Sequence, residues 1–98
     1  MSDESTPSPE HHATLEIKNR LGLHARAAVL LVQTASRFEA EVTVSKDGQS
    51  VNGRSIMGIM MLAAEQGSSI DVTTSGPQAE EALEAIRELV DARFNEGE

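Results

Sequence analysis

Hydrophobic and polar residues alternate in three segments of the chain, over residues 14–18, 38–45 and 70–73. This period is typical of a strand with one buried face. The Asp47-Gly48 pair, which favours a tight hairpin turn, follows the second of these segments. We therefore expect a further short strand over residues 49–52, which gives a set of four strands.

Between and after these strands the hydrophobic residues take up helical spacing. Residues 25–37 carry one apolar face, and residues 55–64 form a short, very apolar stretch. Ser75-Gly76-Pro77 predicts the start of a last helix, with the proline in its first turn and apolar spacing that continues to Phe94. The predicted order is β-α-β-β-α-β-α. Alternation requires one solvated face, so we expect an α+β fold, a two-layer open-faced β-sandwich with three helices on the other face.

The ends of the chain differ in composition from the middle. Residues 1–12 are polar, acidic and contain proline, and we expect a disordered acidic tail there, with one domain over residues 13–95 and a short tail at 96–98. The start resembles no secretory signal, and no apolar run is long enough to cross a bilayer. The chain has no cysteine, which agrees with a reducing compartment. We expect a cytoplasmic protein.

The composition argues against two classes of partner. A net charge of −8, and two phenylalanines without tyrosine or tryptophan for stacking, argue against nucleic acid, and the absence of a long apolar run argues against a membrane. Residues 17–38 and 48–64 nevertheless contain five basic residues and no acid, so they sum to +5 and the remainder sums to −13. One interpretation is that these segments form a face that binds a phosphate or an acidic partner. The other is that they are helices that simply contain few charged residues. Composition alone leaves both readings open.

His24 is the strongest candidate for chemistry. It stands in GLHARAA, directly before the first predicted helix, where unpaired amides and the positive end of the helix dipole favour an anion. The same dipole disfavours imidazolium and keeps the ring nucleophilic. Arg26 could bring a fork of donors to phosphate oxygens. The pattern indicates transfer of a phosphoryl group to imidazole, although a lone histidine at a helix end is also common as a structural or solvated residue.

The other motifs are weaker evidence for a functional site. His11 and His12 have no third ligand nearby and no zinc spacing, so we expect no metal site. The glycines form neither dinucleotide-binding nor phosphate-loop patterns, so no nucleotide cofactor is expected. Ser55 suits the N-cap of the second helix. That helix is too short to bury Ile56, Met57, Met60 and Met61 together, so we expect exposed methionine, with Ile59 and Leu62 in the core.

Two segments together resemble one family. GLHARAA and VNGRSIMGIMMLAAEQGSSI are similar to the two signature regions of HPr, the histidine-containing phosphocarrier of the bacterial phosphoenolpyruvate-dependent phosphotransferase system. The resemblance covers about residues 14–94. It implies a four-stranded antiparallel sheet in the order 1-4-2-3 under three helices, in agreement with the pattern above.

The resemblance also implies roles for particular residues. It implies phosphorylation of His24 on Nδ1, with Arg26 beside the phosphate, and it aligns Ser55 with a regulatory serine that an ATP-dependent kinase modifies in many members. It implies no cofactor. One departure is Ala27, where the family usually has proline. The docking surface that it implies is made of Ala25, Val29, Arg54, Ile56, Met57 and Met60.

The expected function is that of a carrier, not an enzyme. The resemblance implies enzyme I as donor and sugar-specific enzyme IIA domains as acceptors. A monomer is the default expectation. A regulatory carrier of a nitrogen-related or incomplete branch needs the same histidine, so the sequence leaves that alternative open. A third hypothesis is an adaptor that binds a transcription regulator after HPr kinase/phosphorylase has modified Ser55. The presence of His24 speaks against a purely serine-regulated adaptor.

Overall fold

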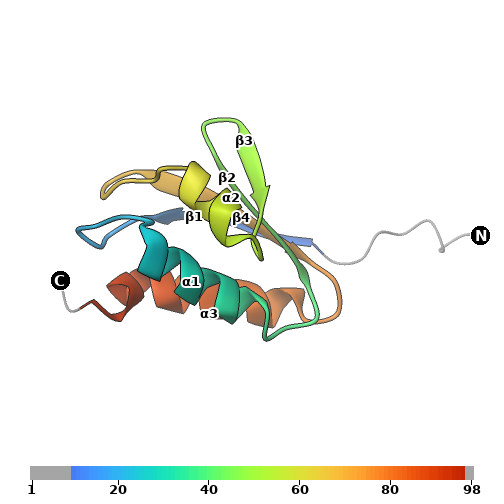
Figure 1. Cartoon of the computed structure of the whole chain (residues 1–98). Helices are drawn as coiled ribbons and strands as arrows, with labels where there is room; N and C mark the ends of the chain where they lie inside the picture. Colours follow the sequence, from blue (N-terminus) through green and yellow to red (C-terminus); the bar gives the residue numbers. More distant parts are fainter. Residues whose placement is uncertain (1–9, 97–98) are drawn as a thin grey trace, which may run out of the picture.

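Four antiparallel strands form one sheet in the order β1-β4-β2-β3 (Figure 1). The computed structural model describes residues 10–96. The strands are β1 (Glu10–Glu16), β2 (Glu41–Lys46), β3 (Gln49–Asn52) and β4 (Ser69–Ser75). The predicted sheet order is confirmed. The β2–β3 hairpin turns at Asp47-Gly48, where both residues have positive φ, as the sequence pair predicts.

Three helices accompany the sheet, α1 (Ala25–Ala35), α2 (Ile56–Met61) and α3 (Ala79–Asp91). Helix α1 packs against both α2 and α3, and α3 packs on β1 and β4. Figure 1 shows α1 and α3 side by side beneath the sheet, with α2 near the β2–β3 hairpin. This arrangement is the predicted α+β open-faced sandwich.

The hydrophobic core lies between the sheet and the helices. Val44, Ile70 and Val72 alternate with more exposed residues along their strands, and all three have no exposed surface. From the helices, Leu31 and Ile86 meet them, and they are equally buried. Full burial of such a side chain contributes about 1.5–3 kcal/mol. The alternation seen in the sequence therefore corresponds to the core face of the sheet.

The first strand differs from the prediction. It begins at Glu10 and ends at Glu16 instead of spanning residues 14–18, so residues 10–12 belong to the sheet and not to a tail. His11 pairs with Thr74 and His12 with Thr73 of β4. The hydrogen bonds between paired strands join backbone groups and do not depend on the side chains, so this polar segment pairs with β4 although it shows no alternation of hydrophobic and polar residues. The rest of the expected tail, residues 1–9, lies outside the described residues, as do residues 97–98.

Element ends also differ from the predicted ones by a few residues. Helix α1 ends at Ala35, α2 ends at Met61, and β2 begins only at Glu41. Pro77 precedes α3, whose N-cap is Gln78, so the prediction of proline in the first turn was wrong. The Gln78 side chain instead accepts a hydrogen bond from the backbone N–H of Glu39 at 2.7 Å, which closes the turn against the segment before β2.

The loop before α1 is held against the segment after α2. The backbone N–H of Leu23 donates to the carbonyl oxygen of Ala64 at 2.9 Å. Gly22 adopts a φ of +69°, and a β-carbon there would collide with that same carbonyl. Glycine is therefore required for both conformation and close approach. This contact fixes the backbone immediately before His24.

Candidate functional site

His24 is the N-cap residue of α1, with extended backbone angles (φ −79°, ψ −178°). Its carbonyl oxygen accepts the first hydrogen bond of the helix, from Ala28 at 2.8 Å. No side chain caps this end of α1, and the first turn contains no acidic residue. The leading amides of a helix lack partners inside it and carry the positive end of its dipole. The predicted anion-favouring position of His24 is therefore present.

The imidazole of His24 is partly exposed, with 28% of its side chain accessible. Its Nε2 lies 2.5 Å from the Oε2 atom of Glu96, which comes from the far end of the chain. Glu96 thus contacts Nε2 of the ring, and Nδ1 is left without this contact. A surface imidazole with one nitrogen held and the other available suits nucleophilic chemistry.

Arg26 lies on the same side of the helix end as Glu96. Its Nη1 donates to the carbonyl oxygen of Phe94 at 3.4 Å and lies 3.9 Å from the Oε2 atom of Glu96. More than half of the Arg26 side chain is exposed. A shallow hollow is lined by Leu21, His24, Arg26, Asn95 and Glu96. The structure therefore brings Arg26 to the edge of the hollow that contains His24, as the spacing of the two residues predicts.

Glu96 is the member of this site that sequence reasoning missed. We expected residues 96–98 to be a tail, and for Glu96 this was wrong, because only 9% of its side chain is exposed. Its Oε1 accepts a hydrogen bond from Nδ2 of Asn19 at 3.2 Å. The hydrogen bond with His24, aided by Asn19 and by the charge of Arg26, lowers the pKa of Glu96 against the opposing effect of burial. The carboxylate is therefore ionised near neutral pH.

A left-handed turn carries the chain back to the site. Arg93, Phe94 and Asn95 follow α3 with φ values of 57°, 52° and 61°, a region that non-glycine residues seldom adopt. The Phe94 side chain is fully buried in the core. The backbone N–H of Glu96 then donates to the carbonyl oxygen of Arg93 at 3.0 Å. Burial of Phe94 anchors the turn, and the turn places Glu96 beside His24.

The second predicted region forms α2. Ser55 is its N-cap, and its hydroxyl oxygen accepts a hydrogen bond from the backbone N–H of Gly58 at 2.9 Å, which confirms the predicted capping role. Ile59 and Leu62 are buried, as expected. The exposed side chains of the helix, which were expected to include methionine, are Ile56, Met57, Met60 and Met61, at 40%, 74%, 42% and 63%.

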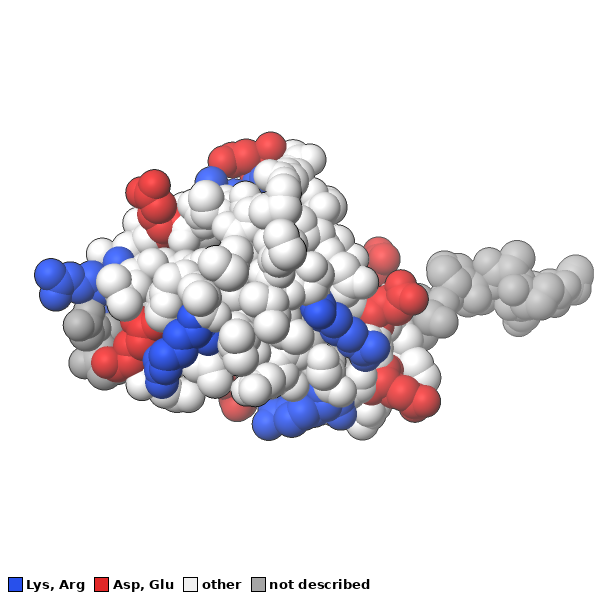
Figure 2. Space-filling model, in the orientation of Figure 1, with Lys and Arg blue, Asp and Glu red and all other residues white. Residues whose placement is uncertain are grey.

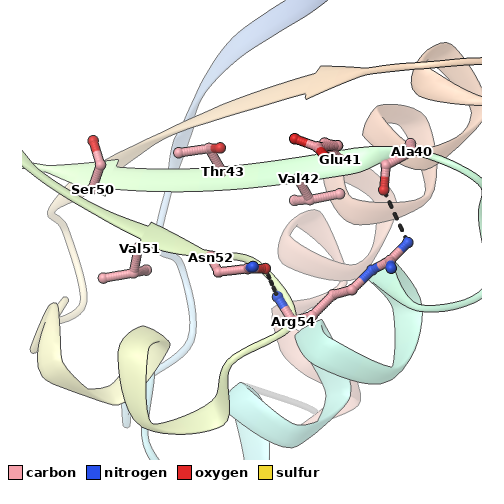
Figure 3. A pocket seen from close by; sticks show the side chains of 8 residues that line it. All are labelled: Ala40, Glu41, Val42, Thr43, Ser50, Val51, Asn52 and Arg54. Atoms are coloured by element: carbon pink, nitrogen blue, oxygen red, sulfur yellow. Dashed lines mark hydrogen bonds between the residues drawn. The ribbon is translucent and has the colours of Figure 1, made fainter.

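Arg54 lines a hollow along β2 and β3, and His24 is not among the lining residues of that hollow (Figure 3). Its Nη2 donates to the carbonyl oxygens of Phe38 and Ala40, both at 2.9 Å. Its backbone N–H donates to Oδ1 of Asn52 at 2.8 Å. The guanidinium of this predicted docking residue is thus committed to two carbonyl groups. On α1, Ala25 is exposed and Val29 half-buried.

Figure 2 shows how charge is distributed over the face that carries α1 and α2. The surface there is largely uncharged, with separate Lys and Arg side chains around it and acidic side chains toward the rim. The acid-free segments 17–38 and 48–64 contribute the five basic residues counted above, and the exposed Ile56, Met57, Met60 and Met61 of α2 are apolar. Such a face suits a partner with complementary negative charge.

The adjacent histidines, considered in the sequence for a metal, lie on β1. His12 has its Nε2 3.6 Å from Oδ1 of Asp71, and both side chains are about half exposed. Among residues 10–96, no three His, Cys, Asp or Glu side chains gather in a way that could hold a metal ion. In the same part of the chain, none of the helices has the length and apolar character needed to cross a bilayer.

Known proteins match nearly the whole described chain. A family model for the PTS HPr component phosphorylation site matches residues 11–92. Phosphocarrier protein HPr of Neisseria meningitidis is 51% identical over 85 residues, which cover 87% of this chain and 96% of that protein. The solved structure of HPr-C-His from Thermoanaerobacter tengcongensis matches with a TM-score of 0.85 and 46% identity, over 88% of this chain and 97% of that one. HPr from Bacillus anthracis gives a TM-score of 0.80 and 48% identity, over 83% and 96%.

The chain is an open-faced sandwich with a histidine at the N-terminus of its first helix, and the family model matches most of its length. These features define the class of phosphocarrier proteins of the phosphotransferase system. The chain belongs to the HPr family.

Proposed function

We propose that the protein accepts a phosphoryl group on Nδ1 of His24 from phosphorylated enzyme I and passes it to sugar-specific enzyme IIA domains. The observation that carries the proposal is the position of His24 at the uncapped N-terminus of α1 with Arg26 beside it. The protein itself converts no metabolite and needs no cofactor for this step. It would act in the cytoplasm as a monomer.

The transfer step is a displacement at phosphorus. The lone pair of Nδ1 forms the new N–P bond, the bond between phosphorus and the donor breaks, and its electron pair stays with the donor. The leading amides of α1 and the guanidinium of Arg26 then stabilise the phosphoryl oxygens. Passing the group to an acceptor reverses these roles, and the electron pair of the N–P bond returns to Nδ1.

The exposed face of α2 supports the docking part of the proposal. Ile56, Met57 and Met60 form an apolar surface that water must leave when a partner binds, and flexible methionine adapts to partners of different shape. Helix α1 packs against α2, so Ala25 and Val29 extend the same surface toward His24. Arg54 adds positive charge at its border. One surface of this kind would serve both donor and acceptors.

A regulatory role is the second candidate. Ser55 lies half-buried at the start of the docking helix, with its hydroxyl oxygen used as a cap. Phosphorylation there by HPr kinase/phosphorylase would place a dianion beside the apolar surface and alter the choice of partner, including transcription regulators. A carrier in a nitrogen-related or incomplete branch would use His24 in the same way. Only the acceptor distinguishes that branch from sugar transport.

Incubation of the full chain with enzyme I and labelled phosphoenolpyruvate tests the proposal. We expect acid-labile label on the protein, since phosphohistidine is unstable in acid, and release of that label to an added enzyme IIA domain. Label that is stable in acid, or no label while a reference HPr is phosphorylated in a parallel reaction, would exclude the carrier role.

A further inference from the structure

Three of the four methionines of the chain gather on one short helix. Met57, Met60 and Met61 all lie within α2, while Met1 lies outside the described residues. Helical residues three and four positions apart share a face, so Met60 and Met61 lie on the same side of α2 as Met57. The exposed fractions are 74% for Met57, 42% for Met60 and 63% for Met61. An oxidant dissolved in water therefore reaches all three side chains.

The methionine thioether is the group of this chain that reacts most readily with a peroxide. Peroxides oxidise cysteine and methionine at sulfur, and the sequence contains no cysteine. A sulfur lone pair attacks one oxygen of hydrogen peroxide, so the S–O bond forms while the O–O bond breaks. The other oxygen leaves as hydroxide and takes the proton of the transferred OH group. Sulfur loses two electrons, the peroxide gains them, and the products are methionine sulfoxide and water.

Oxidation on the exposed side of α2 leaves the core contacts of the helix intact. The other side of the helix carries Ile59 and Leu62, which are buried. It also carries Gly58, where a β-carbon would lie 3.0 Å from the β-carbon of Val51 on β3. The hydroxyl of Ser55 caps the helix through the Gly58 amide. None of these contacts involves a methionine, so we expect the fold to tolerate the sulfoxides and the effect of oxidation to lie at the surface.

We propose that Met57 and Met60 form a reversible oxidation site, at which conversion to the sulfoxide by a peroxide weakens the docking of enzyme I and of acceptors. The inference deepens the proposed function and rests on its docking surface, which Met57 and Met60 form together with Ile56. A sulfoxide turns a flexible apolar side chain into a polar one. Its oxygen accepts hydrogen bonds from water and loses them when an apolar partner surface covers it.

The oxidation is reversible by an enzyme that uses a dithiol. Methionine sulfoxide reductases remove the sulfoxide oxygen as water, while the dithiol is oxidised to a disulfide and the thioether is restored. The docking surface would therefore weaken when peroxide is present and recover after reduction. Since donor and acceptors share this surface, oxidation would slow both the loading and the unloading of His24.

Mass mapping and a binding titration test the inference on the full chain. Hydrogen peroxide supplies the oxidant, and peptide mass spectrometry locates each added oxygen atom. Enzyme I is then titrated with oxidised and with untreated protein, without phosphoenolpyruvate. We expect binding to be about tenfold weaker after oxidation, the scale of covering a polar group that has no hydrogen-bond partner. The melting temperature should stay near that of the untreated protein, and methionine sulfoxide reductase with a dithiol should restore the affinity.

Met61 provides the matched control, because it is exposed on the same helix but lies outside the docking surface defined above. A double variant that combines Met57→Leu with Met60→Leu keeps Met61, and leucine replaces methionine at similar volume. Each variant is compared with itself before and after oxidation, so the effect of the substitutions cancels. We expect Met61 to be oxidised in the double variant without loss of affinity, whereas Met61→Leu should lose about tenfold on oxidation, like the parent.

Several results would overturn the inference. One is unchanged affinity of the parent with sulfoxide at Met57 and Met60, and another is an equal loss of affinity in the double variant. A third is a loss that the reductase does not reverse, or that comes with a large fall in melting temperature, because damage to the fold would then be the cause. Failure of the proposed function is distinguishable from these results. A protein that binds enzyme I but accepts no phosphoryl group is no carrier, while the ratio of affinities still decides the role of Met57 and Met60.

Discussion

Nη1 of Arg26 donates a hydrogen bond to the carbonyl oxygen of Phe94 at 3.4 Å, so the first turn of α1 is linked to the turn that follows α3. The bond is long and the side chain is mostly exposed. A guanidinium held this loosely is free to turn toward a phosphoryl group when one arrives on the neighbouring ring.

Arg26→Ala should therefore retain phosphorylation of His24 but transfer more slowly. The amides of α1 still face the dianion, whereas the charge-assisted hydrogen bonds of the guanidinium, about 1.5–3 kcal/mol, are lost. Rapid-quench rates with enzyme I measure the effect, and Arg37→Ala, at an exposed position past the end of the same helix, is the matched control. If both variants react at the parental rate, Arg26 has no part in the chemistry.

Ala27→Pro should be tolerated or mildly stabilising. Helix α1 begins at Ala25, so the amide of Ala27 lies in the first turn and has no acceptor inside the helix. Proline restricts the unfolded chain and stabilises a compatible site by about 0.4–1 kcal/mol. Ala27 is fully buried, so the ring must fit its surroundings. Thermal unfolding tests this, and a clear fall in melting temperature would mean that this first turn departs from the geometry usual in the family.

Ser55 has a capping role that substitution separates from its effect on docking. Ser55→Ala loses the acceptor for the Gly58 amide and should cost about 0.5–2 kcal/mol of stability. Ser55→Asp keeps an acceptor, so its melting temperature should stay near that of the parent. Its negative charge beside Ile56 and Met57 should nevertheless slow phosphorylation of His24 by enzyme I, because the partner must desolvate it.

The Ser55-phosphorylated protein extends this comparison, since it carries about −1.5 to −2 charges at the same position. We expect slower transfer than in Ser55→Asp with the fold retained. Transfer as fast as in the parent, in both forms, would reduce Ser55 to a helix cap and remove the regulatory candidate.

The lowered pKa of Glu96 predicts a pH dependence of stability. A carboxyl group whose pKa is lower in the folded state contributes stability that is present above its unfolded pKa and is lost as pH falls through the folded value. The groups that face it are His24, Asn19 and Arg26. Glu96→Gln should thus be less stable than the parent near neutral pH. The two should converge in acid, below the lowered pKa. A difference in melting temperature that is independent of pH would contradict the ion pair.

Those parts of the site that depend on local pattern could be predicted from the sequence. His24 precedes an amphipathic segment, and Ser55 precedes an apolar one, so the residues next to each of them are enough to assign it to a helix start. The alternation along β2 and β4 likewise indicates which face of the sheet is buried. The order of the strands came from the family resemblance, because alternation does not say which strands are neighbours.

The parts of the site and fold that the sequence did not predict depend on tertiary contacts. Glu96 lies seventy-two residues from His24 in the chain, and it follows three residues that adopt left-handed conformations without a glycine to indicate them. The apolar spacing predicted that the last helix continues to Phe94, whereas α3 ends at Asp91 and Phe94 is buried from the turn that follows. The start of β1 was missed for a similar reason, because residues 10–12 pair with β4 although their sequence shows no alternation of hydrophobic and polar residues.

The central claim is that His24 carries the phosphoryl group on Nδ1. The most direct measurement incubates the parent and His24→Ala with enzyme I and labelled phosphoenolpyruvate, and then maps the phosphorylated nitrogen in the parent by phosphorus and nitrogen-15 NMR. His24 lies at the partly exposed end of a helix, so His24→Ala should fold normally. We predict acid-labile label in the parent, with phosphorus coupled to Nδ1, and none in His24→Ala. Acid-labile label in His24→Ala, or phosphorus on Nε2 in the parent, would contradict the account.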